Sequence, residues 1–224
     1  MTDRRPLKPY DVEISVPVGR DEAWEAVTRP EVLRQWFGWD YDGLEAEIRQ
    51  IFIDEATLWA PERMGWADGS SLEVAGDDDS ARIRVAREGS GPVAEEVYDA
   101  IEEGWRAFLT QLAFLLRERP AGQRRTIYLT GETTGRQALT LATGDWQRFG
   151  PRVASTVDGD GHLVVVAGHL PLDAPSAARF EVTISTFGLD DPAFETVRET
   201  WAKRWAPMAA DANLTTAENP APNS

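Results

Sequence analysis

The sequence predicts an α+β protein made of a larger unit that ends in a long amphipathic helix and a smaller unit of strands and helices. Three observations support this prediction. Apolar residues alternate over Asp11–Val18, which is the period of a half-buried strand. They recur every three or four residues over Val93–Arg119, which is the period of a helix face. Between them, the polar run Gly76–Ser80 joins two apolar segments, as a hairpin turn does.

Further elements of the first unit follow the first strand in order. Asp21 is suited to cap a helix over Glu22–Thr28. Pro30 stops that helix and opens another over Glu31–Phe37. Residues 43–59 fit the period of a helix and of a strand, so we interpret this stretch as mixed.

A hairpin and the long helix complete the first unit. The hairpin strands are predicted at Ser71–Ala75 and Ala81–Arg87. Acidic residues open the helix and arginines close it, which suits the helix dipole, and Pro120 ends it. Its apolar residues are Val97, Ile101, Trp105, Phe108, Leu109, Leu112, Leu115 and Leu116.

The second unit is predicted to be smaller and to combine strands with helices. Strands are expected at Arg124–Thr130, Leu163–Ala167 and Phe180–Thr186, a short helix after Thr134, and a final helix that opens at Asp190 and carries Phe194, Val197, Trp201 and Trp205. We therefore expect a first domain at residues 1–120 and a second α+β unit at residues 121–210. Residues 211–224 are rich in Asn, Pro, Thr and Ser, which predicts a disordered tail.

The order of a strand, two short helices, several strands and a long helix resembles the SRPBCC (START-like) superfamily over residues 10–119. The segments that carry the resemblance are VEISVPV, RDEAWEAVTRPEVLRQWFG and EEGWRAFLTQLAFLLRERP. Within the superfamily, the chain is similar to the branch named after the activator of the heat-shock-protein-90 ATPase. The resemblance implies a helix-grip fold, in which a curved antiparallel sheet surrounds the long C-terminal helix and a hydrophobic cavity lies between them.

The chain departs from the superfamily pattern at two places. The region Trp39–Glu88 is short, which leaves the number of strands open. The chain also continues past the long helix, so residues 124–208 are either a degenerate second copy of the first unit or a strand-rich cap. The segment GDWQRFG at Gly144–Gly150 is similar to LRQWFG at Leu33–Gly38.

Composition excludes several classes of function. The net charge of −15 disfavours binding to nucleic acids and to anionic membranes. The chain has no cysteine and two histidines, so we expect no disulfide and no metal site. It carries no Gly-rich phosphate loop and no Gly-x-Ser-x-Gly motif, and we expect no cofactor. No apolar run is long enough for a membrane span or a signal peptide, so we expect a cytoplasmic protein.

The expected function is binding of a small apolar molecule between the sheet and the long helix. Such sites are lined mainly by aromatic and aliphatic groups with few polar anchors. The candidate ligand-binding residues are Trp36, Phe37, Trp39, Trp59, Trp66, Tyr98, Trp105 and Phe108. Two alternatives stay open: a polyketide cyclase-like or hydrolase-like enzyme, which requires a buried ionisable group facing the cavity, and a co-chaperone-like interaction module, which requires an exposed apolar patch and a poorly formed cavity.

Candidates for polar anchors are fewer. Glu96, Glu103 and Arg63 are considered, whereas Glu73 and Arg84 are predicted to face water because they alternate with apolar strand residues. His162 and His169 are predicted to be loop or strand-edge residues. The identity of the ligand, the presence of catalysis, the catalytic residues and the oligomeric state are left open.

Overall fold

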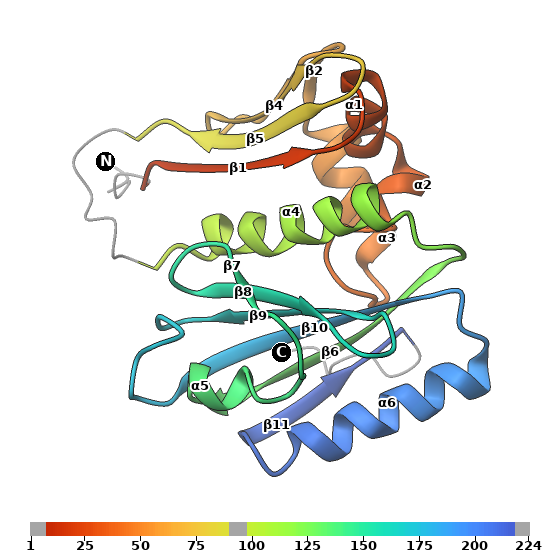
Figure 1. Cartoon of the computed structure of the whole chain (residues 1–224). Helices are drawn as coiled ribbons and strands as arrows, with labels where there is room; N and C mark the ends of the chain where they lie inside the picture. Colours follow the sequence, from red (N-terminus) through yellow and green to blue (C-terminus); the bar gives the residue numbers. More distant parts are fainter. Residues whose placement is uncertain (1–7, 90–97, 218–224) are drawn as a thin grey trace.

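The structure, a computed structural model, describes residues 8–89 and 98–217. Its elements form stacked layers: a five-stranded antiparallel sheet, helix α4, a six-stranded antiparallel sheet, and helix α6 on the far side (Figure 1). The predicted α+β fold class is therefore confirmed. Within the described ranges, no helix combines the length and the apolar character that crossing a membrane requires.

The first unit contributes the five-stranded sheet, several short helices and α4. Its strands are β1 (Tyr10–Val16), β2 (Thr57–Trp59), β3 (Arg63–Gly65), β4 (Ser70–Gly76) and β5 (Ala81–Arg87). Its helices are α1 (Arg20–Thr28), α2 (Pro30–Leu33), α3 (Leu44–Arg49), the π-helix η1 (Gln50–Asp54) and α4 (Ala100–Glu118). The strand order is β1-β5-β4-β3-β2. Val12, Ile14 and Val16 of β1 are buried, as their alternation predicts.

The second unit arranges its strands in the same way. Its strands are β6 (Arg124–Thr133), β7 (Gln147–Arg148), β8 (Val153–Val157), β9 (Leu163–Gly168), β10 (Ala178–Phe187) and β11 (Ala210–Thr215), and its helices are α5 (Gly135–Ala138) and α6 (Asp191–Trp205). The order β6-β10-β9-β8-β7 matches that of the first sheet, and β11 is added beyond β6. A degenerate second copy would have this order; the duplication itself stays a prediction.

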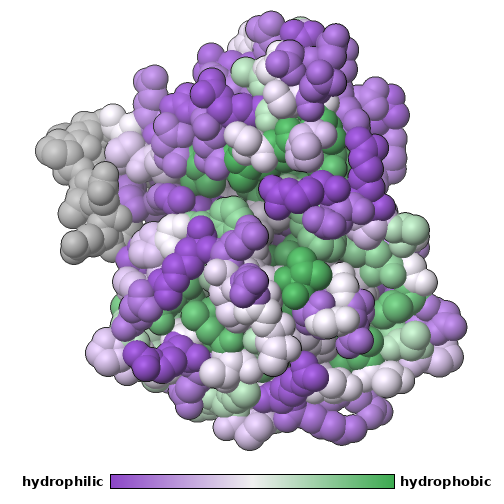
Figure 2. All heavy atoms as spheres, in the orientation of Figure 1, coloured by the Kyte–Doolittle hydropathy of each residue, from purple (hydrophilic) through white to green (hydrophobic). Residues whose placement is uncertain are grey.

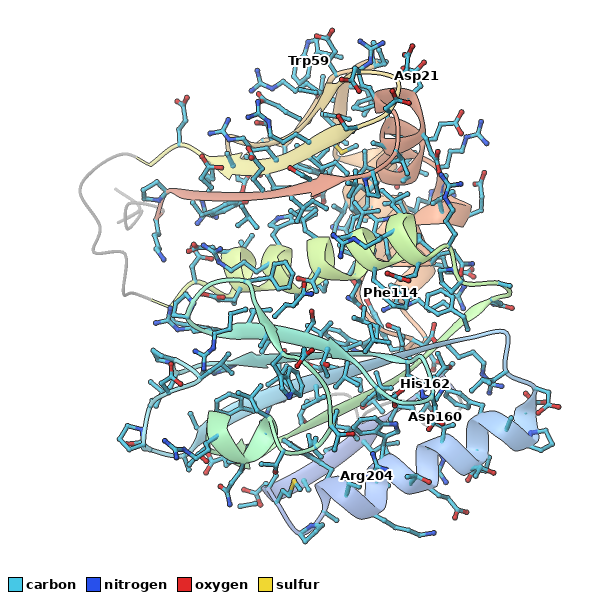
Figure 3. All side chains as sticks on the ribbon, viewed as in Figure 1. Asp21, Trp59, Phe114, Asp160, His162 and Arg204 are labelled. Carbon is cyan, nitrogen blue, oxygen red and sulfur yellow. The ribbon has the colours of Figure 1, made fainter. Side chains whose placement is uncertain are left out.

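Helix α4 carries apolar side chains on two faces, and each face is buried against one of the two units. One face carries Leu109 and Leu112 into the core of the first unit. The other face carries Ala107 and Phe114, which pack on residues of β8 and β9. Figure 3 shows Phe114 between α4 and the second sheet, and Figure 2 shows hydrophobic atoms at this level, where the units meet. The second sheet is also covered on both faces, since α6 packs Trp201 on its far side.

A buried polar junction joins the two units beside α4. The guanidinium of Arg124 donates hydrogen bonds to the backbone oxygens of Phe37 and Gly38, at 3.1 and 2.8 Å. It also donates to Ser185 on β10, at 3.2 Å, and to the side-chain oxygen of Gln111 on α4. One side chain thus connects the loop after α2, the long helix and the second sheet.

The start of α4 differs from the predicted start of the long helix. The side chain of Asp99 accepts hydrogen bonds from two backbone N–H groups of the first turn and caps the helix, which begins at Ala100. Tyr98 therefore precedes the helix instead of lying within it. Val93–Val97, including the candidate anchor Glu96, lie outside the described residues.

Other helix predictions had mixed outcomes. The predicted caps Thr134 and Asp190 are confirmed, since each side chain accepts a hydrogen bond from the first turn of its helix. Asp21 does not cap α1 but lies in its first turn, where a carboxylate suits the helix dipole. The second helix is shorter than predicted and ends at Leu33. Residues 43–59 contain α3, η1 and β2, so the mixed interpretation is confirmed.

The strand predictions missed β3, β7, β8 and β11. Of these, β3, β7 and β8 lack a clear alternating pattern over more than a few residues. The predicted disorder of residues 211–224 is wrong for the described part, because Asn213 and Leu214 of β11 pair with Thr130 and Leu129 of β6. This polar strand forms because an unpaired edge of β6 offers it backbone hydrogen bonds. Residues 218–224 lie outside the described residues.

Candidate functional site

A cavity of about 300 Å³ lies between α4 and the second sheet. The loop after α2, together with α3 and η1, closes one side of it. Three parts of the chain line the cavity. The segments before α4 contribute Phe37, Trp39, Glu47, Ile51 and Tyr98, and α4 itself contributes Ala100, Ile101, Glu103, Gly104, Trp105, Ala107 and Phe108. The second unit contributes Tyr128, Val165, Ala167, Gly168, His169, Glu181 and Thr183.

The cavity lies on a different face of α4 from the one that the sequence predicts. We expected it between α4 and the sheet of the first unit. That space is filled by the first core, in which Trp36, Leu72 and Leu112 are fully buried. The cavity opens instead toward the second sheet, where small residues such as Gly104 and Ala167 leave room.

Aromatic rings form much of the cavity wall. The rings of Phe37 and Phe108 lie 4.7 Å apart between centroids, and Trp105 lies 6.3 Å from both. Trp39 stacks on Tyr128 of β6 with centroids 3.9 Å apart and an angle of 3° between the rings. This stack brings an aromatic residue of the first unit directly onto the second sheet.

Five of the eight candidate residues line this cavity. They are Phe37, Trp39, Tyr98, Trp105 and Phe108. Trp36 lies in the first core, where its indole N–H donates to the backbone oxygen of Ala26 at 2.9 Å. Trp66 is half-buried behind Trp105, with ring centroids 5.8 Å apart. Trp59 is 55% exposed at the outer edge of the first sheet (Figure 3), far from the cavity.

Polar residues of the second unit gather at one end of the cavity. Tyr128 and Glu181 both line this end, and their side chains are close enough for the carboxylate to affect the pKa of the tyrosine. His169 lies with its Nε2 atom 3.8 Å from the same carboxylate, and its ring is 4.6 Å from that of Tyr98. Burial, followed by the charge of Glu181, raises the pKa of both tyrosines, so both hydroxyls stay protonated at neutral pH.

Glu103 brings a buried carboxyl group from α4 to the same end. Glu103 is 5% exposed. Its Oε1 atom lies 3.5 Å from an Nη atom of Arg152, and its Oε2 atom lies 3.8 Å from the Nε atom of Arg106. Within the described residues, Oε2 has no hydrogen-bond partner. Burial raises the pKa of Glu103, and the charge of Glu102 adds to this effect, whereas the two arginines oppose it.

The raised pKa of Glu103 makes the stability of the protein depend on pH in a defined direction. The folded protein holds this proton more tightly than the unfolded chain, whose ordinary value is 4.5. The resulting stabilisation is complete below that value and is lost as pH rises through the folded pKa. We expect the free energy of unfolding of the wild type, relative to Glu103→Gln, to fall as pH is raised from about 4 to about 8. Urea unfolding at several pH values measures this difference, and a constant or growing difference would contradict the prediction.

Sequence reasoning missed the contribution of the second unit to the site. Glu181 and Thr183 alternate with the buried Val182 and Ile184, so the polar face of β10 was visible in the sequence. A polar strand face ordinarily faces water, and nothing in the pattern says that α4 covers it. His169 does follow β9, as a strand-edge residue, but its ring lines the cavity.

A group of potential metal ligands lies in the turn between β8 and β9. The ligand atoms of Asp158, Asp160 and His162 lie within 4.8 Å of one another. The carboxylate of Asp158 accepts hydrogen bonds from the backbone N–H groups of Asp160 and His162, and its second oxygen lies 3.2 Å from Nδ1 of His162. These bonds explain the cluster as a turn-stabilising arrangement, so we assign no metal to it.

Comparison with known proteins yields distant structural likeness. No protein-family model and no curated protein matches the chain. DynU16, a protein in the dynemicin biosynthetic locus, is similar with 17% identity and a TM-score of 0.32, over 89% of this chain and 96% of its own. The di-domain ARO/CYC BexL from the BE-7585A biosynthetic pathway is similar with 12% identity and a TM-score of 0.33, over 80% of this chain and 85% of its own.

A substitution at Trp105 tests how α4 packs on the aromatic residues around the cavity. The residue is 8% exposed, and its ring contacts those of Phe37, Phe52, Trp66 and Phe108. We expect Trp105→Ala to lower the free energy of unfolding by about 3 kcal/mol, the low end for a buried Trp, because one side of the ring already faces a cavity. Urea denaturation measures the change. The control Trp59→Ala, at an exposed position, should change stability by less than about 0.5 kcal/mol. An unchanged midpoint for Trp105→Ala would contradict this packing.

Proposed function

We propose that the protein binds a small, mainly apolar molecule in the cavity between α4 and the second sheet. The aromatic wall supports this proposal, because apolar ligand sites are lined mainly by hydrophobic and aromatic groups. We propose Phe37, Trp39, Tyr98, Trp105 and Phe108 as ligand contacts. A cavity of about 150 Å³ holds benzene. The cavity of about 300 Å³ here is about twice that size, so it suits a ligand of roughly two or three aromatic rings.

Gly104 is the observation that carries the proposal. It lies inside a long helix, where glycine destabilises by about 0.5–1 kcal/mol relative to alanine. A Cβ atom at this position would meet the ring of Phe108 at 3.6 Å, an ordinary contact, so close packing does not require glycine. The missing side chain leaves space in the cavity. A helix that gives up stability at the position facing a cavity indicates a cavity kept open for a ligand.

Filling the cavity at Gly104 tests the proposal. N-phenyl-1-naphthylamine is the probe, followed by its own emission and by quenching of tryptophan. We expect the wild type to bind the dye and Gly104→Leu to weaken binding about tenfold or more, since an overfilled site costs about 1–3 kcal/mol.

Gly104→Ala is the matched control for this experiment. It should keep the dye affinity within about threefold and raise the free energy of unfolding by about 0.5–1 kcal/mol, because alanine is the better helix former. If the wild type does not bind the dye, or if Gly104→Leu binds it as tightly, the proposed function is wrong.

An enzyme is the second candidate, because ionisable groups line the cavity. Burial raises the pKa of Glu103, as a general acid requires, and His169 lies 3.8 Å from Glu181, as a base oriented by a carboxylate would. A polyketide cyclase-like reaction would use such a pair on an aldol-prone diketone. Mass spectrometry of the products after incubation tests this: loss of a cyclised product in Glu103→Gln supports catalysis, and equal product without protein rules it out.

The remaining sequence-based expectations receive less support. A co-chaperone-like module stays a prediction; we do not propose it, because the aromatic lining of the cavity favours a small-molecule ligand. Membership of the branch named after the activator of the heat-shock-protein-90 ATPase and a cytoplasmic location stay predictions.

A further inference from the structure

We propose that the cavity is a channel with a closed inner end and a polar mouth, so that its ligand is an aromatic molecule with a hydrophilic group at one end only. The aromatic rings occupy the inner half of the channel. The hydrophilic end lies at the mouth, beside Tyr98, His169 and Glu181. This inference rests on the proposed function and specifies its ligand class.

The second sheet gives the cavity a direction. Three successive pairs of neighbours on β10 and β9 face α4: Glu181 with Ala167, Thr183 with Val165, and Ser185 with Leu163. The first two pairs line the cavity and the third does not. Both members of the first pair are partly exposed, whereas both members of the third pair are buried. The mouth therefore lies at the first pair, and the inner end lies before the third.

Helix α4 runs along the cavity in the same direction. Ile101, Gly104 and Phe108 line the cavity from successive turns, at steps of three and four residues. Gln111 follows on the same face but does not line the cavity. Ile101, in the first turn, is 50% exposed, whereas Gln111 is 3% exposed. The start of α4 therefore lies at the mouth, and its third turn lies at the inner end.

The buried polar junction closes the inner end. The side-chain oxygen of Gln111 accepts hydrogen bonds from Arg124 and from Ser185, and Arg124 also donates to the backbone oxygen of Phe37. These polar groups are paired with one another, and the rings of Phe37 and Phe108 cover the cavity side, 4.7 Å apart. A hydrophilic ligand group at this end would lose its water without gaining a partner, which is unfavourable.

The mouth has the opposite character. Tyr98 is exposed, His169 and Glu181 are half-buried, and all three line the cavity. They bring a hydroxyl, an imidazole and a carboxylate to this end, which together can donate and accept hydrogen bonds. A hydrophilic group here keeps its contact with water, so a chain longer than the cavity can extend out of it.

Naphthalenes with hydrophilic chains at one end or at both ends test the proposal. The probes are 2-methoxynaphthalene, 2,6-dimethoxynaphthalene, and the analogues of each in which tri(ethylene glycol) chains replace the methyl groups. They are titrated into the full-length protein and followed by tryptophan fluorescence. One chain should change the affinity by less than about threefold, because it extends into water. Two chains should weaken binding about tenfold or more relative to the dimethoxy compound, because one of them must enter the closed end.

The two histidines of the chain report the orientation of the ligand directly. His169 lies at the mouth, and His162 lies at the other end of β9, about 20 Å away at the usual rise of a strand. Figure 3 shows His162 on the side of Phe114, which packs on Leu163. A nitroxide at the end of the single chain should broaden the imidazole proton NMR signals of His169 and largely spare those of His162. His169→Gln assigns the two sets of signals.

The outcomes distinguish this inference from the proposed function. Equal broadening of both histidines, or stronger broadening of His162, would overturn the inference and leave the proposed function intact. A two-chain probe that binds as tightly as the dimethoxy compound would also overturn it, as would a single chain that prevents binding. If the dimethoxy compound itself does not bind, the histidine signals still decide. Absence of binding by all four probes would instead refute the proposed function.

Discussion

Replacing Arg124 with leucine should lower the free energy of unfolding by about 3–5 kcal/mol. Its guanidinium donates to the backbone oxygens of Phe37 and Gly38 and to the side chains of Gln111 and Ser185. The backbone oxygen of Phe37 would lose this donor, whereas the oxygens of Gly38 and Gln111 would each keep another, from Gln111 and Ser185 respectively. A buried acceptor that loses its donor costs about 1–3 kcal/mol, and the weakened partners add to this. Relief from burying a charge offsets part of this loss.

The charge state of Arg124 supports this account. Burial lowers the pKa of Arg124 to about 10, while the charge of Asp40 opposes the shift. The guanidinium therefore remains charged at neutral pH, and its hydrogen bonds are charge-assisted. Urea denaturation of Arg124→Leu measures the loss. Arg29→Leu, at an exposed position, should cost less than about 1 kcal/mol. A change below about 1 kcal/mol for Arg124→Leu would show that the junction adds little to stability.

A fragment of residues 1–120 should be soluble but should melt about 10 °C or more below the full chain. The predicted division into units at 1–120 and 121–210 is tested by this experiment. The fragment lacks Arg124 and the second sheet, so the face of α4 that carries Ala107 and Phe114 becomes exposed. We expect the two units to unfold together in the full chain, because they share α4. Calorimetry of both proteins measures the difference.

A substitution at Phe114 makes this comparison specific. Phe114 is 7% exposed in the full chain, where Phe114→Ser should cost about 3 kcal/mol. In the fragment the same position faces water, so the change should be within about 0.5 kcal/mol. A fragment that melts at the full-chain temperature, or equal costs in both proteins, would mean that the two units are energetically independent.

Local features of the fold were predictable because they depend on neighbouring residues. The alternation of Val12, Ile14 and Val16 predicts β1, since a strand turns alternate side chains to opposite faces. Thr134 and Asp190 predict helix starts, since a short polar side chain can satisfy the free N–H groups of the first turn. These interactions span at most a few residues, so the sequence alone determines them.

The long helix was predictable in type but not in its surroundings. Its apolar residues recur at helical spacing, yet they cover two faces, one with Leu109 and Leu112 and the other with Ala107 and Phe114. Such a helix must be buried on both sides, and the pattern does not say which neighbour covers which side.

The same ambiguity decided the candidate site. Five aromatic candidates, Phe37, Trp39, Tyr98, Trp105 and Phe108, lie together around the cavity, because the first-unit segments that carry them meet at α4. The opposite wall, with Tyr128, His169 and Glu181, comes from β6, from the residue after β9 and from β10 of the second unit. No local signal connects it to the first wall.

By itself, then, the sequence determined the α+β class, the order of most elements and five of the aromatic residues that line the cavity. The tertiary structure decided that the cavity opens toward the second sheet and that Glu103 is among the residues that line it. The physical reason is that α4 is apolar on both faces. Its helical period places Glu103 and Gly104 on the face toward the second unit, but only the packing of that unit shows that this face encloses a cavity rather than water.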